Sequence, residues 1–233
     1  MIVLPRPCVY LVTDRRRLAP DARTTRDEIL ALETWLDDAF VAGVDVIQLR
    51  ERDLDGGPLR DLTARLCDRA RAGRTRILVN DRADVAAAAR AHGVHLRADS
   101  APIGRVRELG PDDWIVGRSV HTAAEARAAG TAGAGYVLFG TMFGGGTKGD
   151  SGRIGGIDAL TETVRATRAP VIAIGGIDPG RAASCVAAGA AGVAAISIFL
   201  PEGRAPLAMG VARAVDALRQ AMTSRPHRQG KPC

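Results

Sequence analysis

Short apolar runs alternate with longer segments of helical periodicity along most of the chain. Eight runs rich in Val, Ile and Leu are predicted strands, at residues 9–13, 45–50, 77–80, 93–96, 115–117, 136–140, 171–175 and 193–197. The segments between them repeat apolar residues at helical spacing, as in Ile29, Leu32, Leu36 and Phe40. This alternation predicts an α/β protein made of a single (β/α)8 TIM barrel over residues 1–222. A doubly wound open sheet has the same alternation and is the alternative fold.

Composition narrows the class of protein. The chain has 233 residues, of which 46% are hydrophobic and 3% aromatic, and a net charge of +6. No apolar run is long enough to span a membrane, and few aromatic side chains are available to stack on nucleic-acid bases. The cysteines lack metal-ligand or redox-pair spacing. We therefore expect a cytoplasmic protein that binds an anionic small molecule and neither nucleic acid nor membrane, with a homodimer left open.

Two segments are rich in residues that interrupt regular structure. Residues 144–152 form a Gly-rich loop between the sixth predicted strand and the next helix. The last residues, 223–233, contain Pro, Gly and basic residues without apolar periodicity, so they are predicted to be a disordered tail.

Polar residues follow the predicted strands at the point where each strand ends. In a (β/α)8 barrel these ends share one face, where such folds place their active sites. His121 closes Gly-Arg-Ser-Val-His and can transfer a proton near neutral pH, so it is the candidate catalytic base. The candidate substrate-binding residues at the same face are Arg50, Arg52, Asn80, Ser119 and Lys148. Two structural alternatives are open: an ion pair between Arg50 and Glu51, and capping of the next helix by Asn80 and Asp81.

The ends of the last two predicted strands are candidates for phosphate binding. Gly175 and Gly176 follow one strand, while Ile196 and Ser197 close the other. Barrels recurrently bind phosphate at these positions through backbone N–H groups. Alternatively, the glycines only allow a tight turn before a helix that begins at Asp178-Pro179.

Several of these motifs together resemble one superfamily. Tyr-Leu-Val-Thr-Asp14, Ile-Gln-Leu-Arg-Glu-Arg52, Asn-Asp-Arg82, Gly-Val-His-Leu96, Thr-Lys148 and Pro-Val-Ile-Ala-Ile-Gly-Gly176 occur in the order typical of thiamine-phosphate synthases and thiazole tautomerases. The resemblance covers nearly the whole chain and implies a (β/α)8 barrel. It leaves the choice between two activities.

The synthase branch joins a pyrimidine pyrophosphate to a thiazole phosphate with Mg²⁺. Asp81 matches one metal-binding aspartate of that branch, but Ser100 stands in the place of the second, with Asp99 one residue away. Since Mg²⁺ on pyrophosphate is usually held by one or two carboxylates, the change weakens the resemblance to the synthases. Arg52 also stands in the place of the usual lysine, while Lys148 is kept.

The tautomerase branch, called TenI-like, matches more closely at these positions. Its Gly-Arg-Ser-Val-His pattern includes Arg118 and His121, and its histidine is credited with a proton shift that aromatises a carboxythiazole phosphate. We therefore predict a thiazole tautomerase that needs no cofactor and binds a phosphorylated thiazole. The first alternative is a thiamine-phosphate synthase with Mg²⁺ at Asp81 and Asp99. The second is a barrel that binds a phosphorylated ligand without catalysis.

Overall fold

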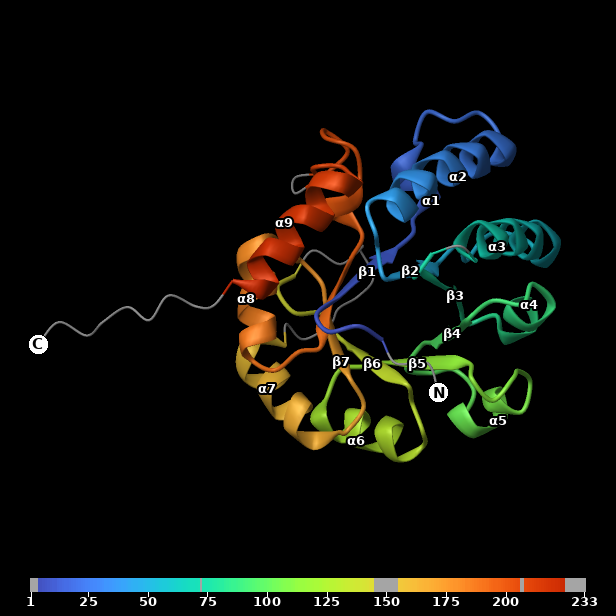
Figure 1. Ribbon diagram of the computed structural model, residues 1–233. Coiled ribbons are helices and arrows are strands. Elements are labelled where there is room, and N and C mark those ends of the chain that lie inside the picture. The colour runs from blue at the N-terminus through green and yellow to red at the C-terminus, as the bar shows by residue number, and fades with distance from the viewer. Residues whose placement is uncertain (1–3, 72, 145–154, 206–207, 225–233) are drawn as a thin grey trace, which may run out of the picture.

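Parallel strands close into a barrel in the computed structural model, which describes residues 4–71, 73–144, 155–205 and 208–224 (Figure 1). Each strand pairs with the next along the chain, and β1 closes against β8, where Val9 pairs with Val193. The predicted closed barrel is therefore confirmed and the open sheet is excluded. The strands are β1 (Cys8–Val12), β2 (Val46–Leu49), β3 (Arg76–Asn80), β4 (Gly93–Leu96), β5 (Ile115–Val120), β6 (Tyr136–Phe139), β7 (Val171–Ile174) and β8 (Gly192–Ala195).

Helices surround the strands on the outside of the barrel (Figure 1). Apolar residues at helical spacing form the inner face of each long helix, as with Leu32 and Leu36, both fully buried. The helices are α1 (Arg15–Leu18), α2 (Thr25–Val41), α3 (Gly56–Ala70), α4 (Ala83–Ala88), α5 (Ile103–Arg107), α6 (Ala123–Thr131), α7 (Gly156–Ala166), α8 (Pro179–Ala187), the short 3₁₀ helix η1 (Ser197–Phe199) and α9 (Val211–Thr223).

The strands divide the core into two layers. Successive strand side chains point to opposite faces, so Val9 and Leu11 join the layer under the helices. Tyr10 and Val12 belong to a second buried cluster, together with Tyr136 on β6. This second layer fills the barrel interior, as expected for eight strands. Because it includes polar side chains, the interior forms the floor of a site at one end of the barrel.

Most strand ends differ from the prediction by one or two residues, and the end of β5 differs most. β5 extends to Val120 instead of ending near residue 117, so Arg118 and Ser119 lie within the strand. The last helix, α9, ends at Thr223, and residues 225–233 of the predicted tail lie outside the described residues. Within the described ranges, no helix has the length and apolar character needed to cross a bilayer.

Candidate active site

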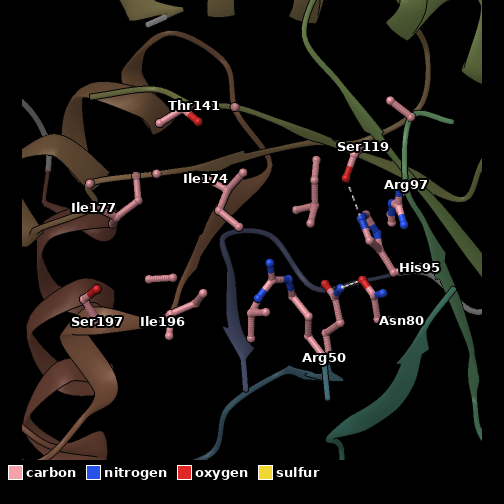
Figure 2. A pocket seen from close by; sticks show the side chains of 18 of the residues that line it. Arg50, Asn80, His95, Arg97, Ser119, Thr141, Ile174, Ile177, Ile196 and Ser197 are labelled. Atoms are coloured by element: carbon pink, nitrogen blue, oxygen red, sulfur yellow. Dashed lines mark hydrogen bonds between the residues drawn. The ribbon is translucent and has the colours of Figure 1, made fainter. Parts of the chain in front are cut away.

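A cavity of about 620 Å³ lies at the carboxyl ends of the strands. Figure 2 shows its two sides: Arg50, Asn80, His95, Arg97 and Ser119 on one, and Thr141, Ile174, Ile177, Ile196 and Ser197 on the other. The polar side comes from β2 to β5 and the more apolar side from β6 to β8 and their loops. The cavity therefore offers mainly polar side chains on one side, and apolar side chains together with the Ser197 hydroxyl on the other.

The predicted site residues mostly meet at this cavity. Its lining includes Arg50, Arg52, Asn80, Ser119, His121, Gly175, Gly176, Ile196 and Ser197. Lys148 falls outside the described residues. The prediction that polar residues at the strand ends share one face is thus confirmed as geometry, while the role of each residue stays a prediction.

One of the two structural alternatives for the strand-end residues is contradicted. The N-cap of α4 is Arg82, and no side chain caps it, so the capping interpretation of Asn80 and Asp81 is wrong. The carboxylate of Glu51 accepts a hydrogen bond from the Arg15 guanidinium at 3.0 Å, which makes Arg15 a partner of Glu51. The pair between Glu51 and Arg50 stays a prediction.

His121 lies at the cavity with one ring nitrogen already bound. Its Nδ1 is 2.5 Å from the Gly140 carbonyl oxygen, and its backbone N–H donates to the Glu125 carboxylate at 2.6 Å. A carbonyl oxygen only accepts, so Nδ1 carries the proton. Proton exchange with a ligand at His121 would therefore use Nε2.

The loop after β7 brings backbone close to the cavity. Gly175 and Gly176 have φ values of 108° and 64°, a region that favours glycine. A Cβ on Gly176 would lie 2.5 Å from the Gly144 carbonyl oxygen. The following helix begins as predicted, with Asp178 accepting from the Arg181 backbone N–H at 2.8 Å and Pro179 in the first turn. The two glycines therefore form a tight turn that packs closely against the loop after β6, and both line the cavity.

An arginine that the sequence did not indicate reaches the second predicted phosphate position. The Arg17 guanidinium, on α1, donates to the Ser197 hydroxyl at 3.0 Å, and both residues line the cavity. A guanidinium beside a hydroxyl and two glycines is a donor-rich environment for a phosphate group.

The polar side of the cavity rests on buried hydrogen bonds. Gln48 donates from Nε2 to the Asn80 Oδ1 at 2.8 Å, and His95 Nε2 lies 2.8 Å from the Ser119 hydroxyl. Burial, with a smaller contribution from the Arg118 charge, lowers the pKa of His95 to about 3, so its ring is neutral at physiological pH. The expectation that His95 is a satisfied core group is confirmed, but the ring also lines the cavity.

Asp81 and Ser100 occupy the two positions that the synthase resemblance gives to metal-binding aspartates. The Ser100 hydroxyl donates to Asp81 Oδ1, whereas Asp99 Oδ2 is paired with Arg97 at 2.5 Å. Arg97 also lies 3.9 Å from Asp81 Oδ2. Within the described ranges, no group of three or more His, Cys, Asp or Glu side chains is arranged so that it could hold a metal ion. One carboxylate and one hydroxyl fit Mg²⁺ that is bound mainly through substrate phosphates, because such sites need few protein ligands.

The charges around the cavity favour an anion. Its lining contains Arg17, Arg50, Arg52 and Arg97. Among the described residues that line the cavity, Asp99 is the acidic one. A closed (β/α)8 barrel with a cationic cavity at the carboxyl ends of its strands defines a class of enzymes that act on phosphorylated small molecules.

Comparison with known proteins gives the family. Residues 9–199 match the family described as thiamine monophosphate synthase, to which the chain belongs. Thiamine-phosphate synthases from Methanoculleus marisnigri and Roseiflexus castenholzii are both 41% identical, over 71% and 84% of this chain and 78% and 82% of their own lengths. The structure of thiamine phosphate pyrophosphorylase from Pyrococcus furiosus has a TM-score of 0.76 and 29% identity, covering 92% of this chain and 95% of that one.

These relatives correct the predicted activity. Several relatives near 40% identity are named thiamine-phosphate synthase, so the prediction of a thiazole tautomerase is wrong. That prediction relied in part on Arg118. In the structure its guanidinium donates to the backbone carbonyls of Arg97 and Ala101 at 2.8 and 2.6 Å, and thereby fixes the loop after β4. A residue with this structural role does not distinguish two chemistries.

Sequence reasoning missed Arg17, Gln48 and Arg97 in the cavity lining. Gln48 had a visible signal, because it is the polar residue inside the apolar run Val46-Ile-Gln-Leu49. Arg17 and Arg97 lie among many arginines, and only the folded chain shows which of them reach the cavity.

Proposed function

We propose that the protein is a thiamine-phosphate synthase, which joins hydroxymethylpyrimidine pyrophosphate to thiazole phosphate. The observation that carries this proposal is the two-sided cationic cavity in a chain whose relatives bear that name. In the reaction, the bond from the pyrimidine methylene carbon to the pyrophosphate oxygen breaks. A bond from the same carbon to the thiazole ring nitrogen forms, and pyrophosphate leaves with the electron pair. No proton is transferred, so His121 acts as a binding residue and not as a base.

The two sides of the cavity suit the two substrates. Gly175, Gly176, Ile196 and Ser197, with Arg17, hold the thiazole phosphate through backbone and guanidinium donors. The pyrimidine ring lies against Asn80 and Ser119 on the polar side. Holding both reactants at the cavity floor supplies much of the rate enhancement, because it converts a bimolecular step into an intramolecular one.

The pyrophosphate would lie near Arg50, Arg52 and Arg97, which line the cavity. Lys148, the remaining predicted substrate-binding cation, lies outside the described residues. Asp81 and the Ser100 hydroxyl would hold Mg²⁺, which would neutralise the charge that grows on the leaving pyrophosphate. The arginines spread the remaining negative charge over planar donors. Asp99, which lines the cavity, is paired with Arg97 at 2.5 Å.

A direct assay tests the proposal. The purified protein is incubated with both substrates, and thiamine phosphate is measured by fluorescence after oxidation to its thiochrome. We expect product only when both substrates and Mg²⁺ are present. Binding of thiazole phosphate without product would refute the synthase and support the non-catalytic barrel.

A matched pair of arginine variants tests the thiazole phosphate site. Arg17→Met should raise KM for thiazole phosphate about ten- to a hundredfold, since hydrogen bonds to charged groups contribute about 1.5–3 kcal/mol. Arg16→Met, at the exposed neighbouring position, should leave this KM unchanged, because Arg16 pairs with Asp53 and does not line the cavity. An unchanged KM in Arg17→Met would remove Arg17 from the site.

A further inference from the structure

A continuous chain of hydrogen-bonded side chains crosses the barrel interior beneath the cavity. It links Asn80 to Gln48 (2.8 Å), Gln48 to Tyr10 (2.9 Å), Tyr10 to Tyr136 (2.7 Å), Tyr136 to His95 (2.9 Å) and His95 to Ser119 (2.8 Å). Tyr10 and Tyr136 are fully buried, and Gln48 and His95 are each 2% exposed. Both ends, Asn80 and Ser119, line the cavity (Figure 2). The interior can therefore control what these two residues offer to a ligand.

The donors in this chain all run in one direction. Tyr10 donates its single hydroxyl hydrogen to the Gln48 Oε1, so the Tyr10 oxygen accepts from Tyr136. The Tyr136 hydrogen is then used, and its oxygen accepts from His95 Nδ1. A buried donor left without a partner costs about 1–3 kcal/mol, so reversing one link alone is unfavourable.

The direction fixes the polarity at both ends. With the proton on Nδ1 of a neutral His95 ring, Nε2 has only a lone pair and accepts from the Ser119 hydroxyl. Ser119 then presents only oxygen lone pairs to the cavity. At the other end, the Asn80 Oδ1 is occupied by Gln48 Nε2, so the Asn80 amide presents N–H donors.

We propose that Tyr10, Tyr136 and His95 are positioning residues that hold Ser119 as an acceptor and Asn80 as a donor at the cavity floor. The cavity then selects a ring that presents an N–H donor to Ser119 and an acceptor atom to Asn80. The ligand part rests on the proposed function, because an aminopyrimidine offers this pattern through its exocyclic amino group and a ring nitrogen. A pyrimidinone, with a carbonyl oxygen in place of the amino group, places an acceptor against an acceptor.

The position of the proton on the His95 ring is tested on the protein without ligand. Histidine labelled with ¹⁵N is incorporated, and the His95 signals are assigned by their loss in His95→Asn. At neutral pH we expect a single neutral tautomer with the proton on Nδ1. A proton on Nε2, or a charged ring, would overturn the proposal. Because no ligand is added, this result does not depend on the proposed function.

A variant that interrupts the hydrogen-bond chain in its middle tests whether this chain controls which ligand the cavity selects. Tyr136→Phe removes the acceptor of His95 Nδ1 and should give a mixture of tautomers. In calorimetric titrations, its preference for the aminopyrimidine pyrophosphate over the pyrimidinone counterpart should fall about tenfold, the scale of one hydrogen bond. Affinity for thiazole phosphate should stay unchanged. Ile172→Val, in the same interior layer but with no polar contact, should alter neither measurement.

The outcomes separate the two proposals. A single Nδ1–H tautomer and unchanged selectivity in Tyr136→Phe would overturn the positioning role. The wild-type protein could have the predicted tautomer and yet show no preference for the aminopyrimidine. That result would overturn the ligand assignment and count against the proposed function. If Tyr136→Phe does not fold, Tyr10→Phe serves in its place, because it frees the Tyr136 hydrogen to point toward His95 and should also mix the tautomers.

Discussion

Ser100 is the residue at which this chain departs from the metal-binding pattern that the synthase resemblance implies. Its hydroxyl donates to Asp81, next to Arg97, so the local charge is less negative than two carboxylates would give. Such a site relies more on substrate phosphates and arginines to hold Mg²⁺. We therefore infer weak Mg²⁺ binding in the absence of pyrophosphate.

The variant Ser100→Asp tests this inference. A second carboxylate beside Asp81 should raise Mg²⁺ affinity of the free protein at least about tenfold, measured by calorimetry. Without Mg²⁺, the like charges should lower Tm by about 2–4 °C, the effect of roughly 1 kcal/mol in a chain of this size, and Mg²⁺ should restore it. Ser100→Asn adds similar volume without charge and should show neither change. Equal Mg²⁺ affinity in both variants would contradict the role given to Asp81.

His95 gives the protein a specific pH dependence. Its pKa is lowered from 6.5 to about 3 in the fold, mainly by burial. Between these values the unfolded chain binds a proton that the folded chain does not, so stability falls as pH decreases from about 6.5 to 3. The group contributes at most about 1.36 kcal/mol per pH unit. His92 also has a lowered pKa, and Glu51 has a raised one, so the contribution of His95 must be isolated.

Urea unfolding of the wild type and of His95→Gln at several pH values isolates that contribution. The difference in unfolding free energy between the two proteins should be constant above pH 7 and should shrink as pH falls from 6.5. A difference that is independent of pH would mean that His95 titrates normally in the fold.

At the scale of elements, the turn between β7 and α8 combines backbone strain with a position in the cavity lining. Gly176→Ala places a side chain at φ 64° and 2.5 Å from a backbone oxygen. We expect a loss of about 1–3 kcal/mol in stability and a higher KM for thiazole phosphate, measured by urea unfolding and steady-state kinetics. Gly180→Ala is the control, because its Cβ would lie 3.5 Å from Asp178 and α8 accepts alanine. Similar effects in both variants would argue against a special role for the turn.

The strands were predictable because their signal is local. Buried runs such as Ile77-Leu-Val79 are apolar on both faces, as is usual for parallel barrel strands. β5 was predicted too short because Arg118 and Ser119 interrupt its apolar run, although hydrogen bonding continues to Val120. The interior chain from Asn80 to Ser119 could not be predicted, since Tyr10 and Tyr136 meet only after the barrel closes. Tertiary contact, and not local pattern, determines which polar strand residues work together.

At the scale of the whole molecule, a buried charge cluster joins the first two β/α units to the cavity. Arg15 is 2% exposed and contacts Glu28 on α2 at 2.8 Å, Glu51 at 3.0 Å and Asp53 at 2.6 Å. The Arg15 guanidinium holds the pKa of Asp53 down at about 2, while burial raises the pKa of Glu51. The same short helix, α1, contains Arg17, whose guanidinium donates to the Ser197 hydroxyl. Glu51 lies between Arg50 and Arg52 in the sequence. The cluster therefore fixes both arginine-bearing segments of the cavity.

Arg15→Met should be strongly destabilising, because it leaves the Glu51 carboxylate buried without its cation. Removing one partner of a buried ion pair costs about 3–5 kcal/mol, and we expect a loss of that size in urea unfolding. The double variant Arg15→Met with Glu51→Gln removes both charges and should recover part of the loss, whereas two independent sites would give additive losses. Any folded Arg15→Met protein should also have a raised KM for thiazole phosphate, since α1 no longer anchors Arg17. A loss of unfolding free energy below about 1 kcal/mol, or strict additivity in the double variant, would show that this cluster does not hold the arginine-bearing segments of the cavity in place.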